Sequence, residues 1–429
     1  MTDLESRNFF TDNDLVGNPY QYFDRLRSLC PVHPEPHHDV MMVTGYREAD
    51  EVYRDTKGFS ACNSVTGPFP GFPVPLEGDD VSRLIAEHRD KLPMADLLPT
   101  MDPPDHTNHR ALLMQLIDPE RLSENEEFMR RLADRQLDAF IGRGRCEFIR
   151  DFAQPFALLV VAELLGVPEA DRDDFTLQLL RGGAEQGTGS GDESDAAQNP
   201  LEFLYERFNT YIKDRRANPR DDVLSRLATA SFPDGSTPEV IDVVRIATSL
   251  FAAGTETTTQ LLGTMIYLAA ERPGLQEALR RDRSLIPNFV EESLRIESPI
   301  KGSFRLTRRP VTVGGVELGA GITVMVLNGA ANNDPGQFPD PRKLDISRDN
   351  ARTHLAFGQG IHACPGAPLV RAEAQVGFNR ILDRMADIRI SDEIHGPPGA
   401  RRFKHVPVYM LRGLASISLD FTPARAESA

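Results

Sequence analysis

The sequence predicts a mainly α-helical protein with a smaller β region, and three stretches carry that prediction. A helix that begins near Pro238 can continue to Glu271, which is roughly 50 Å at about 1.5 Å per residue. A second helix-forming run extends from Ala367 to Met385, directly after a glycine-rich loop. Short apolar runs between glycine turns, at 311–313, 316–318 and 322–326, predict a small sheet beside the helices.

Composition and charge argue against several classes of protein. The formal net charge of −16 disfavours general nucleic-acid binding. The N-terminal residues are polar and no run of eighteen apolar residues occurs, so we expect neither a signal peptide nor a membrane anchor. The four cysteines, Cys30, Cys62, Cys146 and Cys364, lack the spacing of a disulfide framework, which favours a reducing compartment. We therefore expect a cytoplasmic protein.

The N-terminal part of the chain alternates short elements with one long loop. Pro19 is placed to open a helix whose apolar residues recur at helical spacing. Residues 40–44 predict a strand and residues 46–55 a short helix. No clear periodicity follows at 63–98, and a segment of that length without regular structure usually contains a functional loop.

A further helix is expected after the Pro-Pro turn at 103–104. Its His106 and Arg110 stand four residues apart and therefore share one helical face, where they can bind an anion together. The alternative is the ordinary charged face of a surface helix. Helical periodicity continues at 124–141 and at 152–165, which we expect to be scaffold.

The long helix carries an unusual motif in its middle, Ala253-Gly254-Thr255-Glu256-Thr257-Thr258. Small residues there allow a bound group to approach the backbone, while hydroxyl and β-branched side chains weaken the helical ladder and favour a bulge. The alternative is a polar patch whose hydroxyls bond back to carbonyls of the preceding turn. We expect the helix to start with a capping box between Ser236 and Glu239, with Pro238 in the first turn.

One cysteine lies in a setting that suits metal binding. Cys364 belongs to the stretch Phe357-Gly358-Gln359-Gly360-Ile361-His362-Ala363-Cys364-Pro365-Gly366, at the start of a helix. Backbone N–H groups and the positive end of the helix dipole stabilise a thiolate at such a place. A single cysteine cannot build a zinc or iron–sulfur site, whereas a macrocycle that brings four nitrogens needs only one protein ligand. The alternative is a buried structural cysteine in a turn.

The spacing Phe-x-x-Gly-x-His-x-Cys-x-Gly resembles the haem-binding loop of cytochromes P450. The stretches 102–110, 253–258 and 292–295 resemble three further motifs of that family, so the resemblance covers essentially the whole chain. It implies the cytochrome P450 fold in one domain over residues 1–429, with a long central helix over the haem and the Cys-ligand loop before the next helix. The implied helix-rich part is about 80–290 and 365–385, and the implied β-rich part is about 30–60, 300–345 and 386–425.

The resemblance also implies roles for single residues. The cofactor would be haem b (iron protoporphyrin IX), with Cys364 as the axial ligand of the metal. Glu256 and Thr257 would be the catalytic acid–alcohol pair that delivers protons to dioxygen. The propionate partners would be His106, Arg110, Arg305 and His362, and further cofactor contacts would come from Phe357, Gly366 and Ala253.

Other implied features concern the scaffold and the substrate. The pair Glu292 and Arg295 would brace the fold, with Lys343, Arg342 or Arg348 as its third partner. Residues 187–191 would belong to a mobile lid connection, and residues 406–414 would form a β-hairpin that reaches the pocket. The expected substrate wall consists of Phe69, Phe72, Leu98, Ala252, Ile300, Val408 and Met410.

We therefore expect a monomeric haem-thiolate monooxygenase that inserts one oxygen atom of O2 into an apolar small molecule, by hydroxylation or epoxidation. A terpenoid, steroid-like or aromatic substrate fits the wall. A separate ferredoxin and its NAD(P)H-driven ferredoxin reductase would supply electrons, and Arg371 would add positive charge where the ferredoxin docks. Two alternatives are a peroxygenase that uses hydrogen peroxide and a haem protein that binds or senses a ligand without turnover. The Glu256–Thr257 pair disfavours both.

Position 365 departs from many relatives, which have leucine or another residue with an N–H group there. Proline cannot donate a hydrogen bond, so the sulfur of Cys364 would lose one stabilising contact. We expect a more electron-rich sulfur and a lower reduction potential of the iron. Pro365 also suits the start of the following helix.

Overall fold

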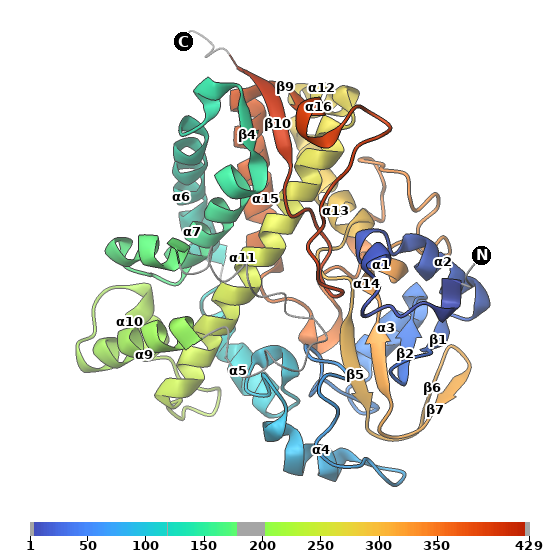
Figure 1. Cartoon of the computed structure of the whole chain (residues 1–429). Helices are drawn as coiled ribbons and strands as arrows, with labels where there is room; N and C mark the ends of the chain where they lie inside the picture. The colour runs from blue at the N-terminus through green and yellow to red at the C-terminus, as the bar shows by residue number, and fades with distance from the viewer. Residues whose placement is uncertain (1–3, 118, 178–201, 425–429) are drawn as a thin grey trace.

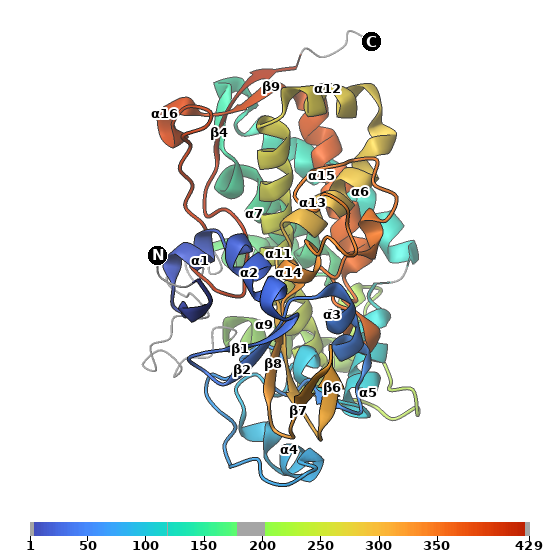
Figure 2. The same cartoon turned by 90° about the vertical axis from the view of Figure 1, so that its right-hand side faces the viewer.

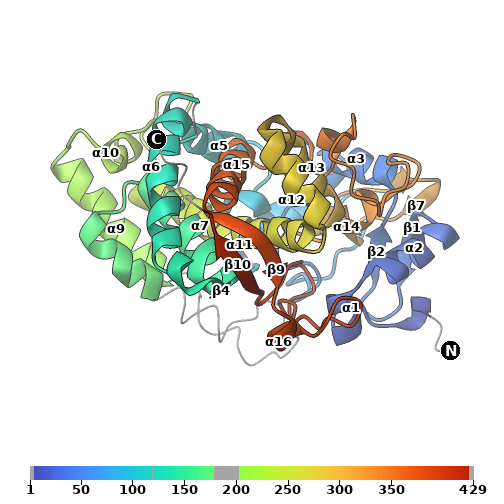
Figure 3. The same cartoon turned by 90° about the horizontal axis from the view of Figure 1, so that it is seen from above.

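The computed structural model of the chain describes residues 4–117, 119–177 and 202–424 (Figure 1). The expected lid connection at 187–191 lies outside these residues. Viewed from above, α6 (Pro119–Asp138), α9 (Glu202–Ala217) and α10 (Val223–Ala228) gather on one side of the molecule (Figure 3). The opposite side holds α2 (Tyr20–Leu29) and α3 (Tyr46–Arg54) with the larger sheet, and α11 (Val240–Ala270) crosses the middle.

The long helix is present, but it starts later than the sequence predicts. Glu239 is its N-cap, and the capping box joins Glu239 to Asp242. Ser236, which we expected in that role, instead donates its hydroxyl to Asp234 at 2.6 Å. Proline disfavours the helical conformation at the residue before it, which keeps Thr237 out of the helix, and the chain is extended at Glu239.

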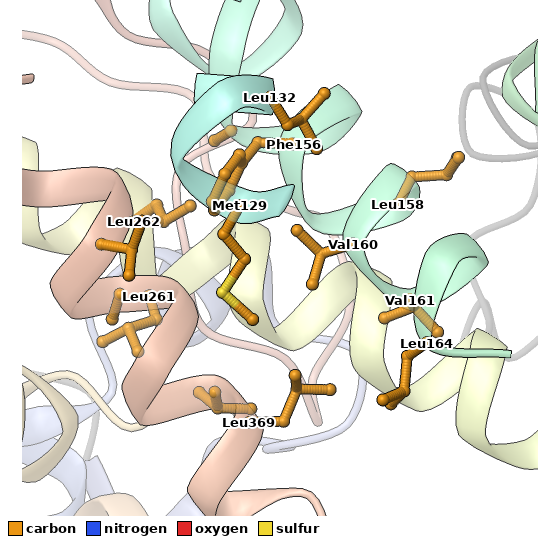
Figure 4. Close-up of a cluster of buried hydrophobic side chains, with 14 of the residues drawn as sticks. Met129, Leu132, Phe156, Leu158, Val160, Val161, Leu164, Leu261, Leu262 and Leu369 are labelled. Carbon is orange, nitrogen blue, oxygen red and sulfur yellow. The ribbon is translucent and has the colours of Figure 1, made fainter. Parts of the chain in front are cut away.

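The main core joins four helices. Apolar side chains of α6, of α7 (Gln154–Leu164), of α11 and of α15 (Ala367–Arg384) interdigitate there (Figure 4). Burial of these side chains is the main favourable term that holds the four helices together. The remaining helices are α1 (Asn13–Gly17), α4 (Ser82–His88), α5 (Asp105–Met114), α12 (Pro273–Arg281), α13 (Ile286–Ile296), α14 (Asn328–Ala331) and α16 (Asp392–His395).

The five-stranded sheet has the order β1-β2-β8-β5-β3. Its members are β1 (Val32–Glu35), β2 (Val40–Val43), β8 (Thr323–Val326), β5 (Ser303–Thr307) and β3 (Phe59–Ser60). β2 and β8 pair in parallel, and the other neighbours pair antiparallel. The short strands β6 (Val311–Val313) and β7 (Val316–Leu318) form a hairpin of their own beside it (Figure 2).

Two features of the β structure differ from the prediction. The stretch 406–414 forms no regular strands and has only isolated bridges, from Leu411 to Ile300 and from Leu414 to His405. Pro407 has no N–H group to extend a ladder. A three-stranded sheet instead joins β4 (Arg145–Glu147), β10 (Ser418–Pro423) and β9 (Met385–Ile390), with β10 in the centre. Thus β4, which lies within the helix-rich part of the sequence, pairs with a strand from the C-terminal region.

Within the described ranges, no helix has both the length and the apolar character that a membrane crossing requires.

Candidate active site

The cysteine loop is built so that its backbone can turn back on itself next to α15. Gly358 and Gly360 have positive φ angles of 64° and 70°. A side chain at Gly360 would place its Cβ 2.6 Å from the carbonyl oxygen of Tyr53, so only glycine permits this approach to α3. The Cys364 N–H donates to the Phe357 carbonyl at 2.8 Å and closes the loop.

The sulfur of Cys364 lies at the N-terminus of α15. Burial raises the pKa of the Cys364 thiol, while hydrogen bonds from the backbone N–H groups of Gly366 and Ala367 and the charge of Arg110 act in the opposite direction. Cys364 is nevertheless partly exposed, so the protein does not enclose its side chain completely. A group that binds beside this loop can therefore reach the sulfur.

Basic side chains from three elements converge near this loop. His106 and Arg110 come from α5, Arg305 comes from β5, and His362 belongs to the cysteine loop. The rings of His106 and His362 lie 4.2 Å apart between centroids. The guanidinium of Arg305 lies 5.2 Å from the centre of the Tyr53 ring and lines one pocket with His362. The four residues predicted as a cluster are therefore brought together.

The charges of this cluster are not balanced. Burial, reinforced by Arg110, lowers the pKa of His106 to about 4, and burial with Arg305 lowers that of His362 to about 2. Both imidazoles are therefore neutral at pH 7, and two guanidinium charges remain. In the described part of the chain, neither Arg110 nor Arg305 forms a salt bridge, although burial lowers the pKa of each. His106 is only 2% exposed and its Nε2 has no partner.

The middle of α11 is not fully covered by other elements. Ala253 is exposed although the helix crosses the centre of the molecule, and Ala252 and Thr257 are half-buried. We expected Gly254 to let a bound group approach the backbone, but it has another function. A Cβ added at this position would lie 2.9 Å from Val161 Cγ2 of α7. Gly254 thus permits close helix packing.

The polar residues of this motif are already bonded. The Thr257 hydroxyl donates to the Ala253 carbonyl at 2.8 Å, and Thr255 and Thr259 make the same bond to the preceding turn. The expected bulge is absent, since α11 is continuous through these residues. Glu256 accepts a hydrogen bond at 2.7 Å from Gln260, one turn later on the same helix. The alternative of hydroxyls bonded back to carbonyls is therefore the observed state.

The Glu292–Arg295 pair is a buried brace. Both side chains are fully buried, and Arg295 donates two hydrogen bonds to the Glu292 carboxylate, at 2.5 and 3.0 Å. Arg348 is the third partner, with its Nε 3.1 Å from Glu292 Oε1. The other two candidates serve elsewhere: Arg342 pairs with Asp24, and Lys343 contributes only its carbonyl. The carbonyls of Asn332 and Pro341 complete the shell of Arg295.

A second buried network lies next to this brace. Glu291 pairs with Arg371 of α15, at 2.6 and 2.9 Å, and with His354 at 3.1 Å. The Arg371 guanidinium lies 4.7 Å from the centre of the Phe357 ring, and the His354 ring lies 5.6 Å from it. Although burial opposes ionisation, His354 and Arg371 lower the pKa of Glu291 to about 2. The network thus holds Phe357, whose carbonyl accepts the hydrogen bond from the Cys364 N–H. Glu291 also balances the positive charge of Arg371.

Comparison with known proteins identifies the family. A sequence model described as Cytochrome P450 matches residues 192–386. Cytochrome P450 144 of Mycobacterium tuberculosis is 32% identical over 91% of this chain and 88% of its own length. The 6-deoxyerythronolide B hydroxylase of Saccharopolyspora erythraea is 34% identical over 89% of this chain and 91% of its own length. The chain belongs to the cytochrome P450 family.

A solved cytochrome P450 structure has nearly the same fold. The substrate-free form of Mycobacterium marinum CYP150A6 is 52% identical, covers 99% of this chain and 100% of its own, and superposes with a TM-score of 0.92. The predicted fold class is therefore confirmed, and the chain is a cytochrome P450 monooxygenase of the haem-binding, haem-thiolate kind.

The residues present fit haem b. The two unpaired arginines match the two negative charges of the propionates, and the free Nε2 of His106 offers a further contact there. The lone sulfur with two N–H donors matches a single axial ligand. The exposed Ala253 leaves the surface of α11 uncovered at the middle of the helix.

The seven residues predicted as a P450 substrate wall have different surroundings in the structure. Ile300 and Met410 lie together, because Ile300 bridges Leu411 and the Lys301 N–H donates to the Met410 carbonyl. Phe69 instead packs between the rings of Phe10 and His38. Phe72 lines a separate cavity, Leu98 and Val408 are buried, and Ala252 packs against the main core.

Three features of the site escaped the sequence analysis. Gln260 binds Glu256 and stands four residues after it, so helical spacing contained the information. Glu373 of α15 accepts from Thr258 of α11 at 2.8 Å, and burial raises the pKa of Glu373 to about 8. An acidic residue on the apolar face of the predicted helix 367–385 was the available indication. Glu291 adjoins the recognised Glu292, and nothing in its spacing distinguishes it.

Proposed function

We propose that this cytochrome P450 hydroxylates or epoxidises an apolar small molecule with electrons from a ferredoxin and its NAD(P)H-driven reductase. The observation that supports the proposal most is the pair of guanidiniums without carboxylate partners, beside a lone cysteine at a helix N-terminus. A terpenoid, steroid-like or aromatic substrate suits the apolar pair Ile300 and Met410. The proposal includes a location in the cytoplasm, which the pattern of cysteines in the sequence supports, and a monomeric state.

Each residue has a defined part in this proposal. Arg110 and Arg305 would bind one propionate charge each, and the neutral His106 and His362 would add hydrogen bonds. Cys364, as a thiolate, would hold the haem iron, and the N–H groups of Gly366 and Ala367 hold its sulfur in position. Haem, when bound, supplies the iron that activates O2 for insertion of one oxygen atom.

Proton supply is the part proposed for Glu256 and Thr257. Gln260 holds Oε1 of Glu256, which leaves Oε2 to take up and release a proton. Thr257 donates to the Ala253 carbonyl at rest, and rotation about its Cα–Cβ bond would release the hydroxyl from that carbonyl. The two side chains are neighbours in sequence on the helix that we propose to face the haem.

Two measurements test the proposal. The reduced holoenzyme should give a red-shifted Soret band with carbon monoxide, and a folded, haem-replete protein without that band would contradict Cys364 ligation. Product formation should require ferredoxin, reductase and NAD(P)H together. Turnover with hydrogen peroxide alone, or binding without any turnover, would favour one of the two alternatives.

A further inference from the structure

A cavity of about 260 Å³ lies between the five-stranded sheet and the loop at 67–72. Leu306 of β5 and Thr323 of β8 line it on the sheet side, together with Ile322. Pro68, Pro70 and Phe72 line it on the loop side, and Asp39 of the β1–β2 turn lies at its margin. All of these residues belong to the described part of the chain.

This cavity is distinct from the proposed haem site. Successive residues of a strand point to opposite faces of the sheet. Arg305 turns to the face of Tyr53 and His362, whereas its neighbour Leu306 packs with Leu92 on the other face and lines the cavity. None of the proposed haem contacts lines it, and Phe72 is the one predicted substrate-wall residue that does.

One buried polar atom of a residue that lines the cavity lacks a partner. Asn63 is only 4% exposed, and its Oδ1 has no hydrogen bond, while its Nδ2 donates to the Thr323 hydroxyl at 3.4 Å. A buried acceptor without a donor is costly, so such atoms usually have a partner from protein, water or ligand. The free oxygen calls for a ligand that donates a hydrogen bond.

The charge at the cavity has the matching sign. Asp39 is exposed, and within the described ranges it forms no salt bridge. The neighbouring His38 is occupied, because its Nε2 pairs with Asn8 and its ring packs against Phe10 and Phe69. A carboxylate and a free amide oxygen together favour a cation that can donate hydrogen bonds.

We propose that this cavity binds a small molecule with an apolar body and a protonated amine. The body contacts Phe72, Leu92, Leu306 and Ile322, and the amine donates to Asn63 Oδ1 and faces Asp39. The volume equals that of about nine waters at ~30 Å³ each, which suits a molecule of roughly that many non-hydrogen atoms, such as a phenylalkylamine.

The test uses phenethylamine and the ferric holoenzyme in isothermal titration calorimetry. Because amines also bind haem iron, the iron is first saturated with imidazole, in a mildly alkaline buffer where imidazole is neutral and the amine stays protonated. We expect binding of one phenethylamine, at least tenfold weaker binding of the neutral 2-phenylethanol, and no binding of phenylacetate.

Three variants decide where the amine binds. Asp39→Asn and Asn63→Leu should each weaken phenethylamine at least tenfold, whereas Asp79→Asn, an exposed carboxylate outside the cavity, should not. Asp39 has a positive φ of 53°, which asparagine also tolerates, so this variant should fold even if Asn63→Leu does not. No binding once the iron is occupied, equal affinity of Asp39→Asn and Asp79→Asn, or equal affinity for phenylacetate would overturn the proposal.

Discussion

At the scale of single residues, position 365 limits the number of backbone donors near Cys364. Gly366 and Ala367 donate to the sulfur, and Pro365 has no N–H group. We predict that Pro365→Leu adds an N–H donor that stabilises the reduced, more negative state of the haem–thiolate site by about 1 kcal/mol. The reduction potential of the haem should then rise by roughly 40 mV. Redox titration of the holoenzyme measures this, with Pro368→Leu on the exposed side of α15 as the control. An unchanged potential in Pro365→Leu would sink the idea.

Lys301 is a buried amine without a carboxylate of its own. It is 1% exposed, and its Nζ lies 3.4 Å from the Val16 carbonyl, while Glu297 is paired with Arg412. Burial, together with Arg412, lowers the pKa of Lys301 to about 7 from its usual value near 10.5. Between pH 7 and pH 10.5 the unfolded chain therefore binds a proton that the folded chain does not. Stability rises with pH through this window, by at most about 1.4 kcal/mol per pH unit.

We therefore predict that Lys301→Met stabilises the holoenzyme at pH 7 and that the gain shrinks as pH rises to 10. Urea unfolding at several pH values measures the difference in free energy of unfolding between variant and parent. Lys404→Met, at an exposed lysine, is the control and should show no such trend. A gain that is constant with pH would show that Lys301 is protonated in the folded protein.

At the scale of elements, Glu291 of α13 joins α15 to the cysteine loop. Its two partners, Arg371 and His354, both pack near the Phe357 ring, and the Phe357 carbonyl accepts a hydrogen bond from the Cys364 N–H. We predict that Glu291→Gln lowers the free energy of unfolding by about 2 kcal/mol. In mild urea, a severalfold larger fraction of the reduced, carbon-monoxide-bound variant should then lack the red-shifted Soret band of thiolate ligation. Glu277→Gln, at an exposed position of α12, should leave that fraction unchanged. If the two variants convert equally, Glu291 acts on the fold alone and does not position the cysteine loop.

Two glycines of α11 offer a matched comparison of helix packing. A Cβ at Gly254 would meet Val161, whose side chain is stiff, at 2.9 Å, whereas a Cβ at Gly263 would meet the far end of Ile149 at 2.8 Å. Alanine favours a helix by up to about 1 kcal/mol over glycine. We predict that Gly263→Ala is neutral or stabilising, while Gly254→Ala loses about 1–2 kcal/mol through overpacking, which thermal unfolding would measure. Equal effects at both positions would contradict this.

Regular elements were predictable from the sequence, and long-range partners were not. Periodicity and proline positions located α5, α11 and α15 to within a few residues, because these patterns act locally. The third partner of Glu292 could not be chosen among three cations, since Arg348 lies in a segment without a regular side-chain direction. The strand β4 is three residues long, too short for a periodic pattern, and its pairing depends on residues far along the chain.

At the scale of the whole molecule, cofactor binding and folding are coupled through charge. Arg110 and Arg305 have no acidic partner among the described residues, so their charges favour the haem-bound state over the haem-free one. We predict that Arg110→Gln lowers the unfolding temperature of the holoenzyme by a few degrees and leaves that of the haem-free protein equal or higher. Arg309→Gln, at an exposed position, should shift neither. Equal losses in both forms would mean that Arg110 stabilises the fold itself.

The pairing of β4 with β10 has a consequence for synthesis of the chain. Glu147 pairs with Ser418 of β10, about 270 residues later, so the edge of β4 has no partner while that length is translated. At about 5–20 residues per second this delay is roughly 15–50 s. During that interval an exposed strand edge invites association between nascent chains. A lower growth temperature, or a chaperone that covers the part of the nascent chain that contains β4, should therefore improve the yield of soluble protein more than any change at the active site.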